Sequence, residues 1–266
     1  MIARRNLLAA FVACAFGLPL AASAHAEKLV VGTTLNNPPW ENRKLDGVFE
    51  GFDIDLVTEI AKRMGDDIEI QDLAWPALFS ATTSGRIDIA ISSITITNDR
   101  LKSQSFTQGY YDSNMALVTS DSSPVKSTAD LKGRTLAALT ASTGEAWIKR
   151  KSAELGIKDY RTYNAQQDML LDIAAGRIDG GIGDIASFQF AFAKMKGMRV
   201  AEPLVTGDKL GIMMKKGSPL LERVNAAMDA IKKDGTMAAL HKKWLGSDAP
   251  ADSSVNKVMP IPQSVD

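Results

Sequence analysis

The tetrapeptide Gly-Arg-Ile-Asp occurs twice in this 266-residue chain, at 85–88 and again at 176–179. Each copy ends a stretch with helical character and opens an apolar run, so in both places a helix stops at glycine and a strand begins. Polar residues follow each strand, Ser92 and Ser93 after the first copy and Asp184 after the second. The repetition predicts that one β-α-β plan is used twice. Junctions of this kind are common in any α/β protein, so the repetition alone does not establish two lobes.

The first part of the chain alternates strand and helix signals. An apolar strand is expected at 29–33 and a shorter one at 68–70. Between them, apolar residues at helical spacing predict a helix from about Asp53, its expected cap, to Met64. A further helix is expected over 75–84. This order favours a largely parallel sheet with helices on both faces, and such sheets bind ligands at the carboxyl ends of their strands.

The stretch from Ile91 to Arg100 suggests what the ligand is. A β-branched strand runs into serine and threonine residues, and Arg100 follows in the first turn of the next expected helix. The planar fork of arginine matches a carboxylate, and a helix N-terminus adds free N–H donors and positive potential. A small carboxylate therefore suits this strand end. A surface arginine beside a loop is the alternative interpretation.

The first 26 residues resemble a secretory signal peptide. Arg4 and Arg5 precede an apolar run, and small residues at Ala24 and Ala26 follow it. The run is too short for a membrane span. We expect cleavage after Ala26, with Ala24 as the second choice, and a periplasmic mature protein. A lipoprotein site at Cys14 is a weaker alternative.

Composition excludes several kinds of chemistry. Cys14 is the only cysteine and falls in the expected signal peptide, so the mature chain is expected to form neither a disulfide nor a thiolate metal site. Only His25 and His241 are present, which argues against a histidine triad or a zinc site. Without Arg4 and Arg5, 29 basic residues face 31 acidic ones, a net charge of −2. No basic patch suggests nucleic acid, and we expect no metal and no cofactor.

The rest of the chain also alternates strand and helix signals. A new first strand is expected over 131–137, followed by Ala141–Gly144 and a helix, and a later strand over 210–214. The last expected helix runs from Met237 to Trp244. The tail, residues 247–266, is rich in Ser, Pro and Asp and is expected to be disordered.

Eight short motifs follow one another in an order typical of one family. They are Asn37-Pro38-Pro39-Trp40, Gly51-Phe52-Asp53-Ile54-Asp55-Leu56, Gly85-Arg86-Ile87-Asp88, Ile94-Thr95-Ile96-Thr97-Asn98-Asp99-Arg100, Phe106-Thr107-Gln108-Gly109-Tyr110-Tyr111, Asp130-Leu131-Lys132-Gly133, Gly176-Arg177-Ile178-Asp179 and Lys243-Trp244-Leu245-Gly246. Through them the chain resembles the polar-amino-acid solute-binding proteins of bacterial ABC importers, solute-binding protein family 3. Each motif is weak alone, and the resemblance rests on their order over nearly the whole mature chain.

The resemblance implies a two-lobed α/β periplasmic-binding-protein fold, with two β-α-β lobes joined by two hinge crossovers. Lobe one would comprise residues 27–113 and return at 207–246, and lobe two would comprise 114–206. The ligand would lie between the lobes. The bends would fall near 112–115 and 206–209.

The resemblance also assigns roles to residues around the α-carboxylate of an amino acid. Arg100 would clamp the carboxylate. Thr95 and the backbone at Ser93 would help to hold both the carboxylate and the α-ammonium. Ser142 and Thr143 would meet the carboxylate from the N-terminus of a helix in lobe two.

Four further residues complete the expected site. Asp184 would pair with the α-ammonium, although its position before Ile185 also suits a helix cap. Trp75 would form a platform over the ligand. Asn37 replaces an aromatic residue common at its position, and Trp40 would either contact the ligand or pack inside lobe one.

The loop from Thr33 to Asn37 bears on the ligand's side chain. It contains no acidic residue, and Thr34 stands where binders of basic amino acids often carry a carboxylate. A basic side chain would therefore lack its counter-charge. We expect a neutral polar or an acidic amino acid.

The function implied is binding of an amino acid and its delivery to the membrane permease of an ABC importer, by a monomeric protein that is not an enzyme. The competing hypothesis is a periplasmic enzyme on the same fold, such as a lyase resembling cyclohexadienyl dehydratase. That chemistry would need a cleft carboxyl group with a raised pKa and no partner for an ammonium.

Overall fold

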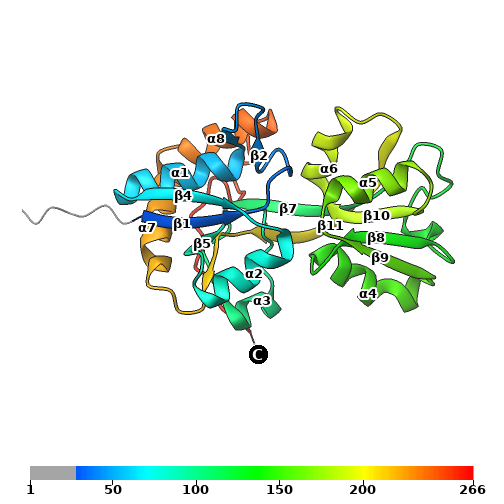
Figure 1. Ribbon diagram of the computed structural model, residues 1–266, viewed down its shortest axis with the longest axis horizontal. Helices are drawn as coiled ribbons and strands as arrows, with labels where there is room; N and C mark the ends of the chain where they lie inside the picture. Colours follow the sequence, from blue (N-terminus) through cyan, green and yellow to red (C-terminus); the bar gives the residue numbers. More distant parts are fainter. Residues whose placement is uncertain (1–27, 266) are drawn as a thin grey trace, which may run out of the picture.

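The computed structural model describes residues 28–265, which form two lobes side by side along the long axis of the molecule (Figure 1). Each lobe is built on a five-stranded sheet flanked by helices. Two long strands, β7 (Tyr111–Ser120) and β11 (Met198–Leu210), run from one lobe into the other. The expected two-lobed α/β fold is confirmed. The predicted signal peptide, residues 1–26, lies outside the described residues.

The sheet of lobe one has the strand order β4-β1-β5-β12-β6. The first three pair in parallel, whereas β12 is antiparallel to both neighbours because it carries the chain back from lobe two. The sheet is therefore mixed, where the sequence predicted a largely parallel one. The strands of lobe one are β1 (Lys28–Thr33), β2 (Asn42–Arg43), β3 (Phe49–Glu50), β4 (Asp67–Asp72), β5 (Ile89–Ala90), β6 (Gln104–Phe106) and β12 (Met213–Lys215). Its helices are α1 (Phe52–Met64), α2 (Trp75–Ser84), α3 (Asn98–Ser103), α7 (Leu220–Lys233) and α8 (Thr236–Leu245).

The sheet of lobe two has the order β11-β7-β10-β8-β9. Strands β10, β8 and β9 pair in parallel, and β7 is antiparallel to β10 and β11. Besides the two crossovers, the strands are β8 (Thr135–Leu139), β9 (Asp159–Tyr163) and β10 (Gly180–Asp184). The helices are the 3₁₀ turn η1 (Thr128–Asp130), α4 (Thr143–Leu155), α5 (Gln166–Ala174) and α6 (Ile185–Phe192).

The crossovers explain why lobe one is discontinuous in sequence. The chain leaves it through β7 and returns through β11, and the expected boundaries at 113/114 and 206/207 fall within these strands. The ladder between them shifts register between Leu204 and Asp208, and Gly207 has a positive φ of 68°. An irregular ladder offers fewer backbone hydrogen bonds to resist bending, so this segment is suited to the bend expected near 206–209.

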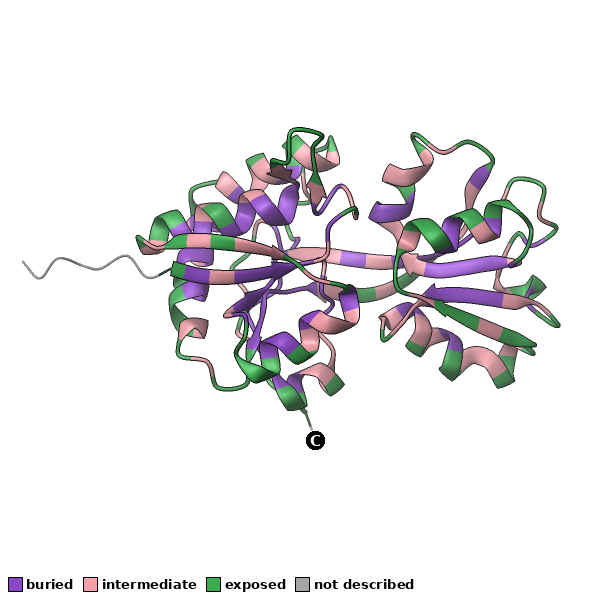
Figure 2. Ribbon diagram, in the orientation of Figure 1, coloured by how far each residue is buried: buried purple, intermediate pink, exposed green. Residues whose placement is uncertain are grey.

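Helix α1 illustrates how the sequence pattern produces the core. Ile54, Val57 and Ile60 lie on one face and are at most 5% exposed, while the opposite face of the helix is open to solvent (Figure 2). Gly65 ends the helix with a φ of 74°, a conformation that glycine adopts without a steric penalty. The predicted helix from Asp53 to Met64 thus agrees with the observed one to within a residue.

The C-terminal tail differs from its prediction. Residues 247–265 pack against lobe one, so the expectation of disorder is wrong for them. The backbone N–H and the hydroxyl of Ser254 donate to the Asp112 carboxylate, at 2.8 and 2.6 Å. Asn98 and Val265 exchange two hydrogen bonds of 2.8 Å. Polar composition misleads here because these partners lie more than 100 residues away in the sequence.

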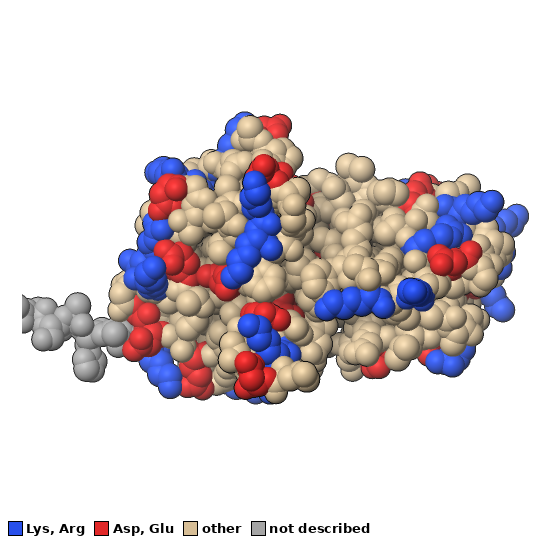
Figure 3. All heavy atoms as spheres, turned by 90° about the horizontal axis from the view of Figure 1, so that it is seen from above, with Lys and Arg blue, Asp and Glu red and all other residues tan. Residues whose placement is uncertain are grey.

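Acidic and basic side chains are interspersed over both lobes on the face seen from above (Figure 3). Within residues 28–265, no helix is both long and apolar enough to span a membrane.

Candidate ligand-binding site

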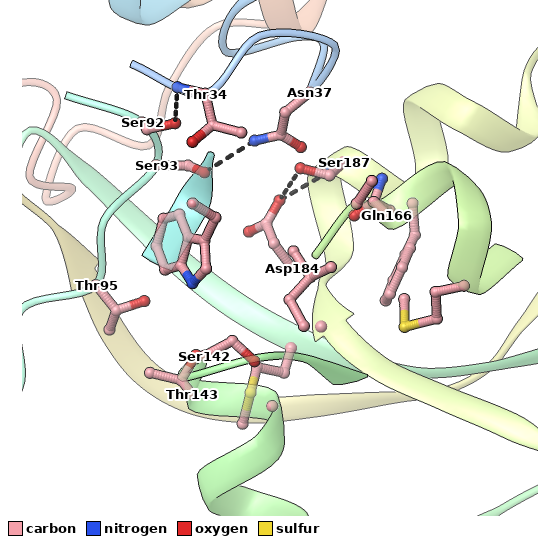
Figure 4. Close-up of a pocket in the computed structure, with 18 of the residues that line it drawn as sticks. Thr34, Asn37, Ser92, Ser93, Thr95, Ser142, Thr143, Gln166, Asp184 and Ser187 are labelled. Carbon is pink, nitrogen blue, oxygen red and sulfur yellow. Dashed lines mark hydrogen bonds between the residues drawn. The ribbon is translucent and has the colours of Figure 1, made fainter. Parts of the chain in front are cut away.

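A cavity of about 200 Å³ lies between the two lobes (Figure 4). Both lobes and both crossovers contribute to its wall. From lobe one come Thr34, Leu35, Asn36, Asn37, Trp75, Ser92, Ser93, Thr95 and Arg100; from lobe two come Leu139, Ser142, Thr143, Gly144, Asn164, Ala165, Gln166, Gln167, Asp168, Met169, Ile182, Gly183, Asp184, Ser187 and Phe188; the crossovers add Ser113, Met115, Asp208 and Leu210. Eight of the nine residues predicted from the sequence line this one cavity.

Arg100 is the only lysine or arginine among the described residues that line the cavity. Its guanidinium donates to the carbonyl of Thr95 at 2.8 Å and, across the cleft, to the carbonyl of Ala141 at 3.2 Å. It also lies over the rings of Trp75 and Phe79, 5.6 and 4.9 Å from their centroids. Burial lowers the pKa of Arg100 to about 10, so the group remains a cation at neutral pH. The surroundings hold it in one orientation and leave a fixed positive charge in the cavity.

The N-terminus of α4 faces the same cavity from lobe two. The Ser142 hydroxyl accepts the backbone N–H of Glu145 at 3.1 Å and caps the helix. A side chain at Gly144 would place its Cβ 2.3 Å from the carbonyl oxygen of Ile182, so only glycine lets the helix approach β10 so closely. The first N–H groups of a helix have no partners within it. Together with the helix dipole they favour an anion beside Ser142 and Thr143.

Asp184 supplies a negative charge from the end of β10. One carboxylate oxygen accepts the backbone N–H of Ser187 at 2.8 Å and the Ser187 hydroxyl at 2.9 Å, which confirms the predicted helix cap. The other accepts the Ser113 hydroxyl at 2.7 Å. The carboxylate also lines the cavity (Figure 4). A cation and an anion from different lobes therefore line the same small space.

The model of one protein family, described as bacterial extracellular solute-binding proteins, family 3, matches residues 29–247. The chain belongs to this family. Because the match covers most of the chain, both lobes and both crossovers of this solute-binding protein are family elements, and the C-terminal tail lies beyond them.

Curated relatives and solved structures agree with the assignment. ABC transporter arginine-binding protein 1 of Escherichia coli is 32% identical, over 82% of this chain and 91% of its own. The L-cystine-binding protein TcyJ of Escherichia coli is 29% identical, over 83% of each. An ancestral arginine-binding protein solved with arginine has a TM-score of 0.78 at 31% identity, covering 82% of this chain and 98% of its own. Since the relatives are binding proteins, this family member is not an enzyme, and the lyase hypothesis is set aside.

The remaining predicted residues complete the lobe-one wall. Trp75, 8% exposed, contributes its ring at the start of α2. The Asn37 side chain donates to the Ser93 hydroxyl at 3.1 Å. Thr95 lies below them with its side chain toward the cavity (Figure 4). The structure thus brings Asn37, Ser93, Thr95 and Trp75 together, as predicted, from three separate segments of the chain.

Trp40 is the exception among the predicted residues. It is fully buried and is not among the residues that line the cavity, which favours its packing alternative over contact with a ligand. Its indole N–H lies 3.0 Å from the Ser187 hydroxyl and 3.2 Å from Asp184, both in lobe two. Its ring packs edge-on against Phe52 and Tyr111. Trp40 therefore connects lobe one to Asp184 and Ser187 of lobe two.

Backbone strain concentrates at this site. The non-glycine residues with positive φ among those described are Asn36 (66°), Ser93 (46°) and Ala141 (57°). Asn36 and Ser93 line the cavity, and the carbonyl of Ala141 accepts from Arg100. Such conformations cost about 1–3 kcal/mol each and cluster where function requires a fixed geometry.

Sequence reasoning missed a polar run in lobe two. Residues 164–168 follow the end of β9 and open α5, and all five line the cavity. A signal was present, because a polar run directly after a strand falls at the ligand-binding edge of an α/β sheet.

Sequence reasoning also missed two carboxylates behind the lobe-one wall, Glu41 and Asp53. Asp53 was expected to cap α1, but Gly51 occupies the cap position and the Asp53 carboxylate instead accepts the backbone N–H of Ser93 at 2.6 Å. The partner lies 40 residues away. No local pattern could have indicated it.

Proposed function

We propose that this family member binds one amino acid between its lobes and delivers it to the membrane permease of an ABC importer. The observation that carries the proposal is that Arg100 of lobe one and Asp184 of lobe two line the same small cavity. An amino-acid zwitterion has two opposite charges a short distance apart, and burying either without a partner is unfavourable. A site divided in this way holds both charges only when the lobes are together.

The α-carboxylate is assigned to Arg100 and Thr95, with the N-terminus of α4 at Ser142 and Thr143 on the opposite side. The α-ammonium is assigned to Asp184 and the Ser93 region. Asp184 Oδ1 already accepts the N–H and hydroxyl of Ser187 and the indole N–H of Trp40, whereas Oδ2 accepts only the Ser113 hydroxyl among the described residues. A carboxylate oxygen has about two acceptor positions, so Oδ2 has room for an ammonium.

For the ligand's side chain we favour an uncharged polar group, such as the amide of glutamine. The lobe-one end of the cavity offers Thr34, Asn36 and Asn37, and lobe two adds Asn164 and Gln166. These groups donate and accept hydrogen bonds without carrying charge. An acidic side chain would need a second cation, and Arg100 is the one cationic side chain lining the cavity in the described chain. This narrows the sequence expectation of a neutral polar or acidic ligand to a neutral polar one.

A basic amino acid is the second candidate. It is supported by the arginine-binding relatives and by Asp168, an exposed carboxylate at the cavity wall. An ancestral arginine-binding protein of the same fold, 31% identical, has also been solved with glutamine, so both side chains occur among related proteins.

Calorimetry on the mature protein, residues 27–266, with L-glutamine, L-arginine and L-glutamate separates these ligands. We expect L-glutamine to bind most tightly. Tighter binding of L-arginine would overturn the preference for a neutral side chain and keep the amino-acid function. Failure of a thermal-shift screen to detect any of the common amino acids would overturn the function itself.

The cellular setting follows from the same proposal. We expect a periplasmic monomer that presents the closed form to its permease. Intact-mass analysis of the exported protein should give a chain that begins at Glu27, whereas a lipid-modified Cys14 would contradict this assignment.

A further inference from the structure

Two buried carboxylates hold the turn at Ser92 and Ser93 from behind the cavity wall. The Ser92 hydroxyl donates to Glu41 at 2.6 Å, and the Ser93 backbone N–H donates to Asp53 at 2.6 Å. The Asn37 side chain reaches both Glu41, at 3.0 Å, and the Ser93 hydroxyl, at 3.1 Å. Ser93 is one of the strained residues, with a φ of 46°. The two carboxylates therefore fix three residues that line the ligand cavity (Figure 4).

Both carboxylates are fully buried, with no exposed surface. The second oxygen of each, together with the hydroxyl of Tyr110, has no well-aligned hydrogen-bond partner among residues 28–265. Buried polar atoms of native proteins are nearly always paired. A proton held between the two free carboxylate oxygens would satisfy both of them.

The charges around the pair also favour retention of a proton. Asp53 lies close enough to Glu41 and Tyr110 for both to influence its pKa, and the charge of Asp184 in lobe two acts on it as well. Burial raises the pKa of Asp53 to about 7, and burial together with the Asp53 charge raises the pKa of Glu41 well above its usual range. The charged groups that act on the pair are anionic, so ionising both carboxyl groups would bury two like charges side by side.

We propose that Glu41 and Asp53 are positioning residues that share one proton and, as a singly charged pair, hold the Ser92–Ser93 turn for the ligand's ammonium group. The part that concerns the ligand rests on the proposed function. An ammonium seated at Asp184 brings positive charge toward the pair and favours its full ionisation. Binding should therefore release protons near neutral pH, and affinity should rise with pH.

The amide variants Glu41→Gln and Asp53→Asn test this directly. Each keeps an oxygen that can accept the serine donors, and its new NH₂ group can replace the shared proton as a donor to the remaining carboxylate. Asp55→Asn is the matched control: Asp55 lies on the same helix, accepts from Lys243 and Trp244, and is not part of the cavity wall.

The first experiment needs no ligand. Infrared spectra of the wild-type protein at pH 7 should contain the carbonyl stretch of a neutral carboxylic acid. The band should disappear in Glu41→Gln and in Asp53→Asn and persist in Asp55→Asn. Its absence from the wild type, or its survival in both amide variants, would overturn the shared proton.

The second arm uses L-glutamine as the probe, with calorimetry in two buffers of different ionisation enthalpy. The wild type should release protons on binding. Each amide variant should bind about tenfold more weakly and lose the release, because the remaining carboxylate is already ionised and the pair has no shared proton left to give up. Unchanged affinity and unchanged release in both variants would overturn the positioning role. If the wild type does not bind glutamine, the proposed function is wrong for this ligand, and the infrared arm still tests the pair.

Discussion

The two walls of the cleft are held in place in different ways. In lobe two, the anchoring side chains cap their own helices: Ser142 accepts from Glu145 and Asp184 from Ser187, each three residues away. In lobe one, Ser92 is held by a residue 51 positions away.

Some of the residues that line the cavity also differ in burial. Ser92 and Trp75 are at most 8% exposed although they line the cavity, whereas Gln167 and Asp168 in lobe two are exposed. We therefore expect the buried wall residues of lobe one to keep their positions when a ligand binds, and exposed residues of lobe two such as Gln167 and Asp168 to adapt to it.

The largest effect is expected from Arg100→Ala, which removes the cation from the preorganised wall. A ligand carboxylate left without its partner should cost roughly 2–5 kcal/mol of binding free energy, while the fold survives. Lys102→Ala is the control, because Lys102 lies on the same helix and, among residues 28–265, forms its ion pair with exposed Asp99. Calorimetric affinity for Arg100→Ala within a few-fold of the control would rule out the carboxylate role.

A smaller effect is expected from Asp184→Asn, on the lobe-two side. The amide keeps an oxygen for the Ser187 cap and loses the charge that attracts an ammonium, a change of about 1.5–3 kcal/mol. L-Glutamine should lose this affinity, and glutaramate, which lacks the α-amino group, should not. Equal losses of affinity for the two ligands would show that Asp184 caps its helix and does not bind the ammonium.

The next effect concerns the pH dependence of the free energy of unfolding, to which Asp53 behind the lobe-one wall should contribute. The pKa of Asp53 is raised from 3.8 to about 7, so its contribution to stability is complete below about pH 4 and is lost as the pH rises through about 7. Asp53→Asn removes this titration. The free energy of unfolding of the variant, relative to the wild type, should therefore improve by roughly 1–3 kcal/mol between about pH 5 and about pH 8. A constant difference across that range would show that Asp53 does not titrate there.

The smallest effect concerns the contact between the walls. Trp40→Phe keeps the ring packing and removes the indole N–H that reaches Asp184 and Ser187, so affinity should fall by about 0.5–1.5 kcal/mol. Trp244→Phe removes an equivalent bond to Asp55, away from the cavity, and should leave binding unchanged. Equal affinities for the two variants would argue that Trp40 has no part in closure.

The difference between residues held by near neighbours in the chain and residues held by distant ones also explains what the sequence could predict. Local signals placed α1 and α2 to within a residue, Arg100 in the first turn of α3, and Asp184 at a helix cap. Such features depend on neighbours in the chain, and the family motifs extended them to most of the cavity wall.

Features held by distant residues were not predictable in this way. The roles of Glu41, Asp53 and Trp40 depend on partners 40 to 147 positions away, and the packed tail depends on Asp112. Strand boundaries also shifted where a turn intervened. The strand expected from Leu131 begins at Thr135, because residues 128–130 form a 3₁₀ turn that Ser127 and Asp130 cap.

Closure around the ligand is the claim on which the account depends, since Arg100 and Asp184 belong to different lobes. A ligand that uses both groups binds the closed form more tightly and shifts the population toward it; moving the ratio from 1:99 to 99:1 requires about 5.5 kcal/mol of differential binding. Small-angle scattering of the mature protein with and without saturating L-glutamine measures this directly. We predict a smaller radius of gyration in the presence of the ligand, with bending at the irregular ladder near Gly207. An unchanged scattering profile at confirmed saturation would contradict the account, because it would place the whole site within one lobe.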